Sequence, residues 1–248
     1  MNPKTVKIIK IILSSICAAF FASYLVWAAV AGLGSDEVVC GSLVIDITDS
    51  DTYNFINNND IKDKLSEAHI DPVGRKVSHN LADSVEKTIN SISFVKNSEC
   101  YIGDNGVMTL EITQRQPVLM VKTPVEDYYI DSERKKMPVS PHHTALLPVV
   151  TGRVKENMAK SVIFDLVKYL GNNEFYKNHI DQIHVGEDGD YFLGTKKGVN
   201  VIKIGTPDNI YAKLGKLRAW YEQYPGFAWS DKYRMVDVSY EGLIYATK

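Results

Sequence analysis

The six histidines are considered first, because histidine is the commonest side chain for metal binding and for acid–base chemistry near neutral pH. They are scattered along the chain, and no pair shows the i, i+4 spacing of a helical metal motif with a glutamate partner. The adjacent His142 and His143 follow Pro141 in a polar segment, and a metal there would need a third ligand that the sequence does not indicate. This pattern predicts a loop and no metal site.

The carboxylates give no stronger signal. Asp46, Asp49 and Asp51 lie close enough in sequence to suggest calcium, but the central glycine and final glutamate of a calcium-binding loop are missing. Carboxylate pairs are common in a chain with 30 acidic residues, and their spacing selects no general acid and base. We therefore predict no metal, no cofactor and no catalytic carboxylate pair.

Nucleophilic catalysis is equally weakly supported. The chain has no Gly-x-Ser-x-Gly elbow, and neither Cys40 nor Cys100 lies in a recognisable catalytic signature. The two thiols form a disulfide only if their Cα atoms lie about 4.4 to 6.8 Å apart, and we favour two free thiols. The chain is predicted not to be an enzyme, with an anchored hydrolase as a remote alternative. Its net charge of -2 also argues against nucleic-acid binding.

One long apolar segment dominates the N-terminal region. Residues 11–35 carry no charge, and a helix over residues 11–33 would be roughly 34 Å long, enough to cross a hydrocarbon core of about 30 Å. Three lysines precede this segment (Lys4, Lys7 and Lys10), and Asp36 and Glu37 follow it. The positive-inside rule then places residues 1–10 in the cytoplasm and all later residues outside, as in a single-pass protein of the cytoplasmic (inner) membrane.

A cleaved signal peptide is the alternative to an anchor. Ala29-Val30-Ala31 has the small-x-small pattern that signal peptidase accepts. The apolar run before that site is longer than the typical ~7 to 15 residues of a secretory segment. The sequence therefore favours an uncleaved transmembrane helix, followed by a linker over residues 34–42.

The next part of the chain has the element order β-α-α-β-β. Alternating apolar residues predict a strand over residues 43–47. Asn59 and Asn80 are predicted to cap two helices, over residues 60–68 and from residue 80 onward. Asp104-Asn105-Gly106 predicts the turn of a hairpin. These elements define a domain over residues 43–114.

The remaining residues, 115–248, are predicted to form a mostly antiparallel β domain with two helices. Strands are expected at residues 128–131, 180–185, 191–193, 199–204 and 235–240. The first helix, over residues 155–170, would bury Met158, Val162, Leu166 and Tyr169 and end at Gly171; the second would be capped by Thr206 and bury Ile210, Leu214, Leu217 and Tyr221. The fold class is therefore α+β.

Several motifs, taken in order, resemble the FtsQ/DivIB family of bacterial cell-division proteins. The strongest match is the junction, with Gln114-Arg115-Gln116-Pro117-Val118 and then Tyr129-Ile130-Asp131. The end of the chain also matches, through Gly198-Val199-Asn200-Val201 and Val236-Asp237-Val238-Ser239-Tyr240. The β-α-α-β-β unit resembles the POTRA domain of that family. Each motif alone is weak, but together with the anchor they cover nearly the whole chain.

The resemblance implies a non-catalytic scaffold of the division machinery, or divisome, which acts in septum formation. Its implied partners are the small bitopic proteins FtsB and FtsL, with no small-molecule substrate. Two features depart from the family: many members have arginine where this chain has Ser239, and Glu187, Asp188 and Asp190 are acidic around a turn that others make basic. An arginine–carboxylate contact made elsewhere is therefore absent or rebuilt here.

The predicted partner-binding surface is the last strand, around residues 236–245, because a strand that ends a sheet can leave its backbone open to another extended segment. Its contact residues are Val238, Ser239, Tyr240, Leu243, Ile244 and Tyr245. The alternative is an ordinary buried closing strand. Arg115, at the start of the distal domain, is a further candidate contact, with local pairing as the alternative.

A POTRA-type module of envelope transport or assembly, which handles extended client chains, is the main alternative function. Such proteins usually place POTRA domains before an outer-membrane barrel. The residues after 115 leave no room for one, which favours the scaffold.

Overall fold

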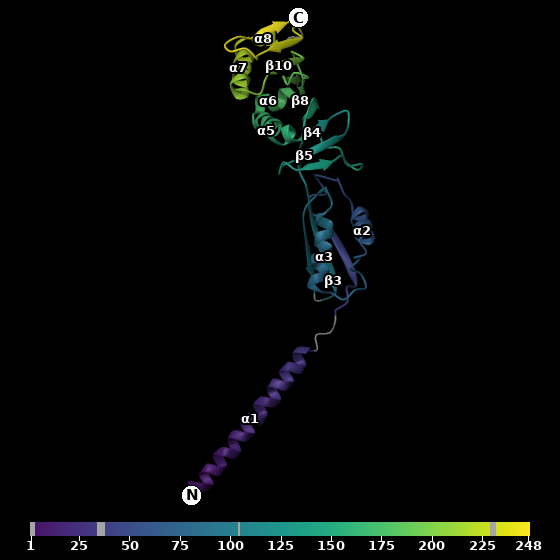
Figure 1. The fold of residues 1–248 in the computed structure, drawn as a ribbon, viewed down its shortest axis with the longest axis vertical. Helices are drawn as coiled ribbons and strands as arrows, with labels where there is room; N and C mark the ends of the chain where they lie inside the picture. The colour runs from purple at the N-terminus through teal and green to yellow at the C-terminus, as the bar shows by residue number, and fades with distance from the viewer. Residues whose placement is uncertain (1–2, 34–37, 104, 229–231) are drawn as a thin grey trace.

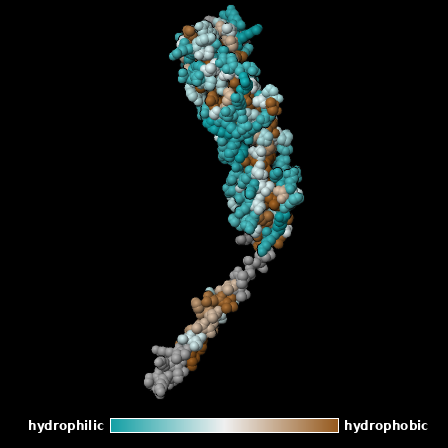
Figure 2. Space-filling model, viewed as in Figure 1, coloured by the Kyte–Doolittle hydropathy of each residue, from teal (hydrophilic) through white to brown (hydrophobic). Residues whose placement is uncertain are grey.

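The computed structural model describes residues 3–33, 38–103, 105–228 and 232–248. The first element is the helix α1 (Pro3–Leu33), drawn in purple in Figure 1 and visible as a hydrophobic segment in Figure 2. Its window Ile12–Ala29 has a mean hydropathy of 1.8, and none of it is buried against the rest of the protein. The helix is long and apolar enough to cross a membrane, as predicted.

The first β-containing unit has the predicted order of elements. It contains β1 (Ser42–Ile47), α2 (Asn58–Glu67), α3 (His79–Asn90), β2 (Val95–Ile102) and β3 (Val107–Gln114). The sheet order is β1-β3-β2, with β1 parallel and β2 antiparallel to β3. The two helices cover one face of this sheet, and Ile61, Leu65, Val85 and Ile89 enter its core. The hairpin turn is also confirmed, since Gly106 has φ 76°.

Both predicted helix caps in this unit were wrong by two residues. Asn57, not Asn59, caps α2: its side chain accepts from the backbone of Asn59 and Asp60, and the Asp60 carboxylate accepts from the Asn57 amide. Ser78, not Asn80, caps α3 through a bond from the Leu81 amide. In each case the earlier residue has extended backbone and can turn its side chain back over the first turn.

The second unit is built on one nine-stranded sheet. Its strands are β4 (Pro117–Lys122), β5 (Asp127–Asp131), β6 (Lys136–Pro138), β7 (Val149–Gly152), β8 (Ile180–Val185), β9 (Tyr191–Thr195), β10 (Val201–Gly205), β11 (Met235–Asp237) and β12 (Tyr245–Thr247). Their order is β12-β11-β10-β9-β8-β7-β4-β5-β6. Three of the pairings are parallel (β4 with β7, β7 with β8, β10 with β11) and the others antiparallel, so the predicted α+β class is confirmed.

More helices pack on this sheet than the two predicted. They are α4 (Glu156–Met158), a π-helical turn (Ala159–Ile163), α5 (Phe164–Asn172), α6 (Glu174–His179), α7 (Ile210–Gln223) and α8 (Pro225–Ala228). The additional helices are short, and α4, the π turn and α5 together replace the first predicted helix. The buried stripe of α7 is the predicted one: Ile210, Leu214, Leu217 and Tyr221.

The π-helical turn changes which side chains of the first helix are buried. An extra residue in one turn shifts the apolar face, so Ala159 and Ile163 are buried while Val162 is 42% exposed. The predicted inward position of Val162 was therefore wrong. Gly171 was also wrongly assigned as the end of the helix, because α5 continues to Asn172.

The start of α7 and the end of the chain also differ from the prediction. Thr206 does not cap α7; the residue before the helix is Asn209, whose φ of 54° lies in the left-handed region. The predicted strand over residues 235–240 ends at Asp237, and residues 238–244 form a loop. That loop returns the chain to form β12 antiparallel to β11.

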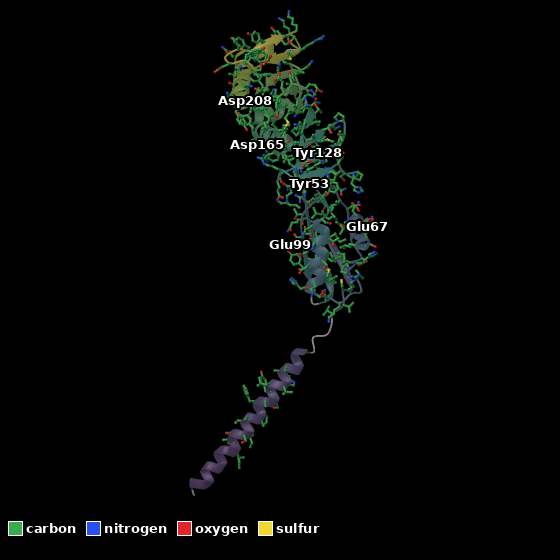
Figure 3. The ribbon with its side chains drawn as sticks, viewed as in Figure 1. Tyr53, Glu67, Glu99, Tyr128, Asp165 and Asp208 are labelled. Atoms are coloured by element: carbon green, nitrogen blue, oxygen red, sulfur yellow. The ribbon has the colours of Figure 1, made fainter. Side chains whose placement is uncertain are left out.

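The two units meet in a shared hydrophobic cluster. Phe55, from the loop before α2, is completely buried against Tyr129 of β5 and Met137 of β6. Its ring stacks on Phe94 and on Tyr53, which Figure 3 labels where the two units adjoin. This cluster makes the junction a packed contact.

Candidate partner interface

One edge of the large sheet is formed by β12, near residue 248, and the opposite edge by β6. β12 pairs with β11 on one side and has no strand on its other side within the part of the chain that the structure describes. Its three residues are exposed. β11 is different, because it is held between β10 and β12. The open edge is therefore β12, which begins at Tyr245, the last residue of the docking edge predicted around residues 236–245; the first part of that range is the paired β11 and a loop.

The predicted contact residues divide between the surface and the core. The side chains of Tyr240, Leu243 and Tyr245 are 56%, 53% and 52% exposed. Tyr240 and Tyr245 contact each other in a T-shaped arrangement with their ring centroids 5.3 Å apart. Together these three side chains form an apolar and aromatic surface beside the open edge.

The other three predicted residues are less accessible. Val238 is completely buried, so its side chain belongs to the core of the domain. Ile244 is half-buried and packs against the same core. The Ser239 hydroxyl donates to Asp237 Oδ1 at 2.6 Å. These residues position the loop before β12 and expose little side chain to a partner.

Lys216 of α7 holds this loop in place. Its ammonium group donates to the backbone carbonyls of Tyr240 and Leu243, the latter at 2.9 Å. Burial and the nearby Lys213 lower the pKa of Lys216 from its usual value. Two carbonyl acceptors from one loop fix its ends relative to α7, and Gly242 takes the left-handed φ of 69° between them.

A shallow cavity lies between α7 and the loop. Its volume is about 350 Å³, and it is lined by polar and charged residues that include Asp208, Lys213, Lys216 and Glu241. Asp208 is labelled at this end of the molecule in Figure 3. Tyr240, one of the exposed residues of the loop before β12, also lines this cavity.

The acidic turn identified in the sequence lies close to Ser239. A Cβ atom on Gly205 would lie 2.7 Å from the Cβ of Ser239 and 3.8 Å from Asp190 Oδ1. Asp190 pairs with Lys203 of β10 at 2.8 Å. Ser239 and Asp190 therefore stand where an arginine would pair with an acidic partner, as the sequence indicated, and neither can make that contact.

Arg115 lies at the junction of the two units and is paired within the chain. Its guanidinium donates to Asp131 Oδ2 at 2.8 Å and lies 3.5 Å from Glu133 Oε2. The side chains of Arg115 and Asp131 are only 14% and 2% exposed. The geometry favours the local role considered for Arg115 over a contact with a partner.

Gln114, just before Arg115, is the polar centre of the junction. Its carbonyl oxygen accepts from the amides of Phe55 and Ile56 at 2.9 and 3.3 Å, and its amide donates to Asp49 and to the Tyr53 carbonyl. It is completely buried. Sequence reasoning did not assign it this role, although it begins the motif that most resembles the family.

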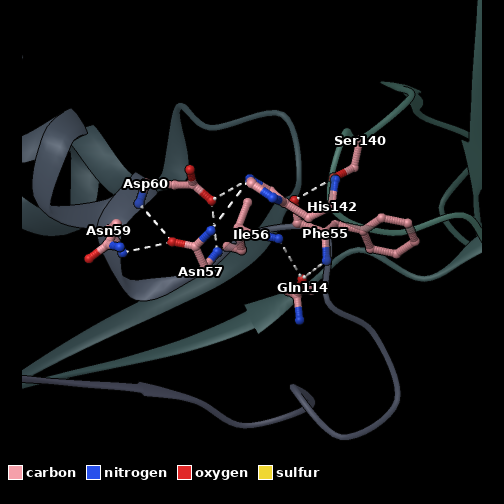
Figure 4. A network of polar contacts seen from close by, with 8 residues as sticks. All are labelled: Phe55, Ile56, Asn57, Asn59, Asp60, Gln114, Ser140 and His142. Carbon is pink, nitrogen blue, oxygen red and sulfur yellow. Dashed lines mark hydrogen bonds and ion pairs between the residues drawn. The ribbon is translucent and has the colours of Figure 1, made fainter.

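A loop of the distal unit closes the same junction, as Figure 4 shows. The Ser140 hydroxyl donates to the Phe55 carbonyl at 2.7 Å and accepts from the His142 amide at 3.1 Å. His142 Nε2 lies 3.3 Å from Asp60 Oδ2. His142 and His143 thus lie in a loop, as predicted, and that loop joins the two units.

The thiols and metal-ligand residues considered for chemistry lie as follows in the described part of the chain. The three cysteines are free thiols, and burial with nearby Glu86 and Cys40 raises the pKa of Cys100 to about 11. Among the residues that the structure describes, no three His, Cys, Asp or Glu side chains are arranged to hold a metal ion.

Comparison with known families identifies both units. A family model described as FtsQ/DivIB, C-terminal related, matches residues 116–247, which is more than half of the chain. This chain belongs to the FtsQ/DivIB family. A POTRA-like domain model matches residues 38–113, and no curated protein matches the chain.

Membership of the FtsQ/DivIB family gives the general role. The family consists of non-catalytic division proteins, so this chain is a division-related scaffold. The apolar helix α1 agrees with a single-pass membrane protein. The POTRA-like match begins at residue 38, within the predicted linker: Cys40 is buried, and the Gly41 amide donates to the Gly106 carbonyl at 2.9 Å. Residues 34–37 lie outside the described part.

Proposed function

We propose that this protein anchors in the cytoplasmic membrane and recruits a bitopic division partner of the FtsB or FtsL type through the open edge of β12. The observation that carries the proposal is the position of β12 at one end of the nine-stranded sheet, where no strand of the described residues pairs with its outer side. An extended segment of the partner pairs with that edge through backbone hydrogen bonds. Tyr240, Leu243 and Tyr245 supply the exposed side chains that select the segment.

The proposed orientation follows the charges that flank α1. Lys4, Lys7 and Lys10 lie before the apolar window, and Asp36 and Glu37 follow it. The positive-inside rule then leaves the N-terminus in the cytoplasm and both folded units outside. In this orientation β12 faces the compartment in which a bitopic partner exposes its own extracytoplasmic segment.

Depletion of the protein distinguishes this function from envelope transport or assembly. A division scaffold predicts filamentous cells, because septum formation fails while growth continues. Envelope defects without filamentation would instead support a transport module. Complementation with a chain that ends after Ser239, and so lacks β12, links the phenotype to the edge. We expect this truncated chain to be inserted in the membrane but not to restore division or capture the partner.

A further inference from the structure

Five exposed apolar side chains gather at one end of the POTRA-like domain. They are Val38, Val39, Val73, Tyr101 and Ile102, each between 38% and 53% exposed. In the described part of residues 38–113, Val44 is the one other large hydrophobic side chain with such exposure. We call these five residues the tip. Figure 2 shows hydrophobic atoms at this end of the domain, next to the grey linker.

Backbone hydrogen bonds hold the segments of the tip side by side. The Val77 amide donates to the Val38 carbonyl at 2.8 Å, and Val39 forms a β-bridge with Lys76. The Gly74 amide donates to the Cys40 carbonyl at 2.8 Å. On the other side, the close approach of Gly106 to the Val39 carbonyl leaves no room for a Cβ atom, which would lie 2.7 Å away. The tip is therefore a built surface of three fixed segments.

Chain connectivity keeps the tip close to the membrane. Four residues, 34–37, separate the end of α1 at Leu33 from Val38. At most ~3.3–3.6 Å per residue, five Cα–Cα steps span no more than about 18 Å. The headgroup layer on each side of a bilayer is about 5 to 8 Å thick, given a core of about 30 Å and a total of about 40 to 45 Å. Val38 therefore lies within about 18 Å of the end of α1, a distance of the same order as the thickness of the headgroup layer.

The composition of the tip suits the lipid interface. Tyrosine and aliphatic side chains partition into the region between headgroups and acyl chains. Arg75 and Lys76, both exposed, follow Val73 and supply cationic groups that match lipid phosphates, while Asp71 before it accepts from the Val73 amide at 3.0 Å. The Tyr101 hydroxyl donates to Glu99 Oε2 at 2.5 Å, and Glu99 lies farther along β2 from the hairpin turn. Glu99 therefore contacts the hydroxyl end of Tyr101, and of the two residues it lies farther from the hairpin turn.

We propose that the tip inserts its apolar side chains into the headgroup region of the same bilayer that α1 crosses. The proposed ligand of the tip is phospholipid, because the short linker keeps the tip near the bilayer whether or not a division partner is present. The contact gives the domain a second attachment to the membrane besides α1. Such an attachment limits how far the distal β12 edge can tilt relative to the membrane.

Photo-cross-linking in the full-length chain tests this proposal. Tyr101 and, in a separate variant, Val73 are replaced by photoreactive p-benzoylphenylalanine, and the protein is reconstituted in nanodiscs of phosphatidylethanolamine and phosphatidylglycerol. Val125, which is 93% exposed in the distal unit, is replaced in the same way as the control. Circular dichroism checks that each variant is folded.

The proposal predicts lipid adducts, identified by mass spectrometry, at positions 101 and 73 and not at position 125. The absence of lipid adducts at both tip positions, or an equal yield at position 125, would overturn it. The experiment is then repeated in native membranes. An adduct formed there with a protein in place of lipid would assign the tip to a partner and would also overturn the proposal.

Discussion

The side-chain carbonyl of Gln114 accepts a hydrogen bond from the backbone amide of Phe55 at 2.9 Å, although 59 positions separate the two residues in the chain. This bond ties the last residue of β3 to the loop that enters the junction. Gln114 also holds Asp49 and Tyr53, so one amide side chain satisfies polar groups from several parts of the POTRA-like domain. Phe55 then packs on Tyr129 of the distal unit.

Replacing Gln114 by alanine is expected to loosen this loop. Buried amides that lose their acceptor cost about 1 to 3 kcal/mol each, so for the amides of Phe55 and Ile56 we expect a loss of roughly 2 to 6 kcal/mol in the free energy of unfolding. Hydrogen exchange should accelerate at the amides of Phe55 and Ile56. Gln116→Ala is the matched control, because the Gln116 side chain is exposed. Equal exchange rates in the two variants would show that Gln114 does not hold the loop.

The role of Gln114 shows why the sequence predicted the elements better than the junction. Alternation and helical spacing indicate which face of an element is apolar. These patterns were enough to predict the strands β1 and β8 and the buried residues of α7. The role of a buried glutamine, by contrast, depends on hydrogen-bond partners that are distant in sequence, and periodicity does not identify them.

Two local features could not be read from periodicity either. The π-helical turn at Ala159–Ile163 inserts an extra residue that no spacing rule anticipates, and it moved Val162 to the surface. After Asp237 the chain returns to form β12, and Lys216 of α7 bonds to the loop that makes this return, a contact between elements that alternation does not predict. The prediction of one edge around residues 236–245 therefore joined a paired strand, a loop and the first residue of β12.

Arg115→Ala is expected to destabilise the protein without weakening partner capture. Asp131 is 2% exposed, so removal of its cationic partner leaves an unpaired buried carboxylate. We expect the free energy of unfolding to fall by about 3 kcal/mol. Chemical denaturation followed by circular dichroism measures this loss. The control is Arg218→Ala, whose pair with Glu222 lies on the exposed surface of α7, where solvent screening leaves it little effect on stability. Lost capture with unchanged stability would instead make Arg115 an interface residue.

Cys100 should react slowly with alkylating reagents. Burial raises its pKa to about 11 from an ordinary value of 9.0, so the thiolate fraction at pH 8 is about 100-fold lower than in the unfolded chain. Site-resolved mass spectrometry after iodoacetamide treatment, with and without urea, measures the ratio.

The same shift has a consequence for stability. The folded protein retains the Cys100 proton after the unfolded chain has lost it, so this group's contribution to stability falls as pH rises from about 9 to about 11. A Cys100→Ser variant should show a smaller fall in stability over this range.

For the alkylation experiment, fast reaction of native Cys100 at pH 8 would show that the thiol is not protected.

Exchange of the anchor tests whether α1 has a role beyond placement. The apolar window of α1 has no side chain buried against the rest of the protein. Replacing residues 1–33 by an unrelated span of the same orientation should therefore preserve much of the division activity. Complete loss of activity, with normal expression and insertion, would mean that α1 makes specific contacts with another membrane helix.

The most direct test of the proposed function is the affinity of the full-length protein for its FtsB- or FtsL-type partner, identified by co-purification from membranes. Tyr245 is 52% exposed on the open edge, and Tyr224, 45% exposed after α7, is the matched control. A tyrosine at the centre of an interface contributes roughly 2 kcal/mol or more, which exceeds tenfold in affinity. We predict that Tyr245→Ala raises the dissociation constant at least about tenfold while Tyr224→Ala leaves it unchanged. Unchanged affinity in Tyr245→Ala, and also in the chain that ends after Ser239, would contradict docking at β12.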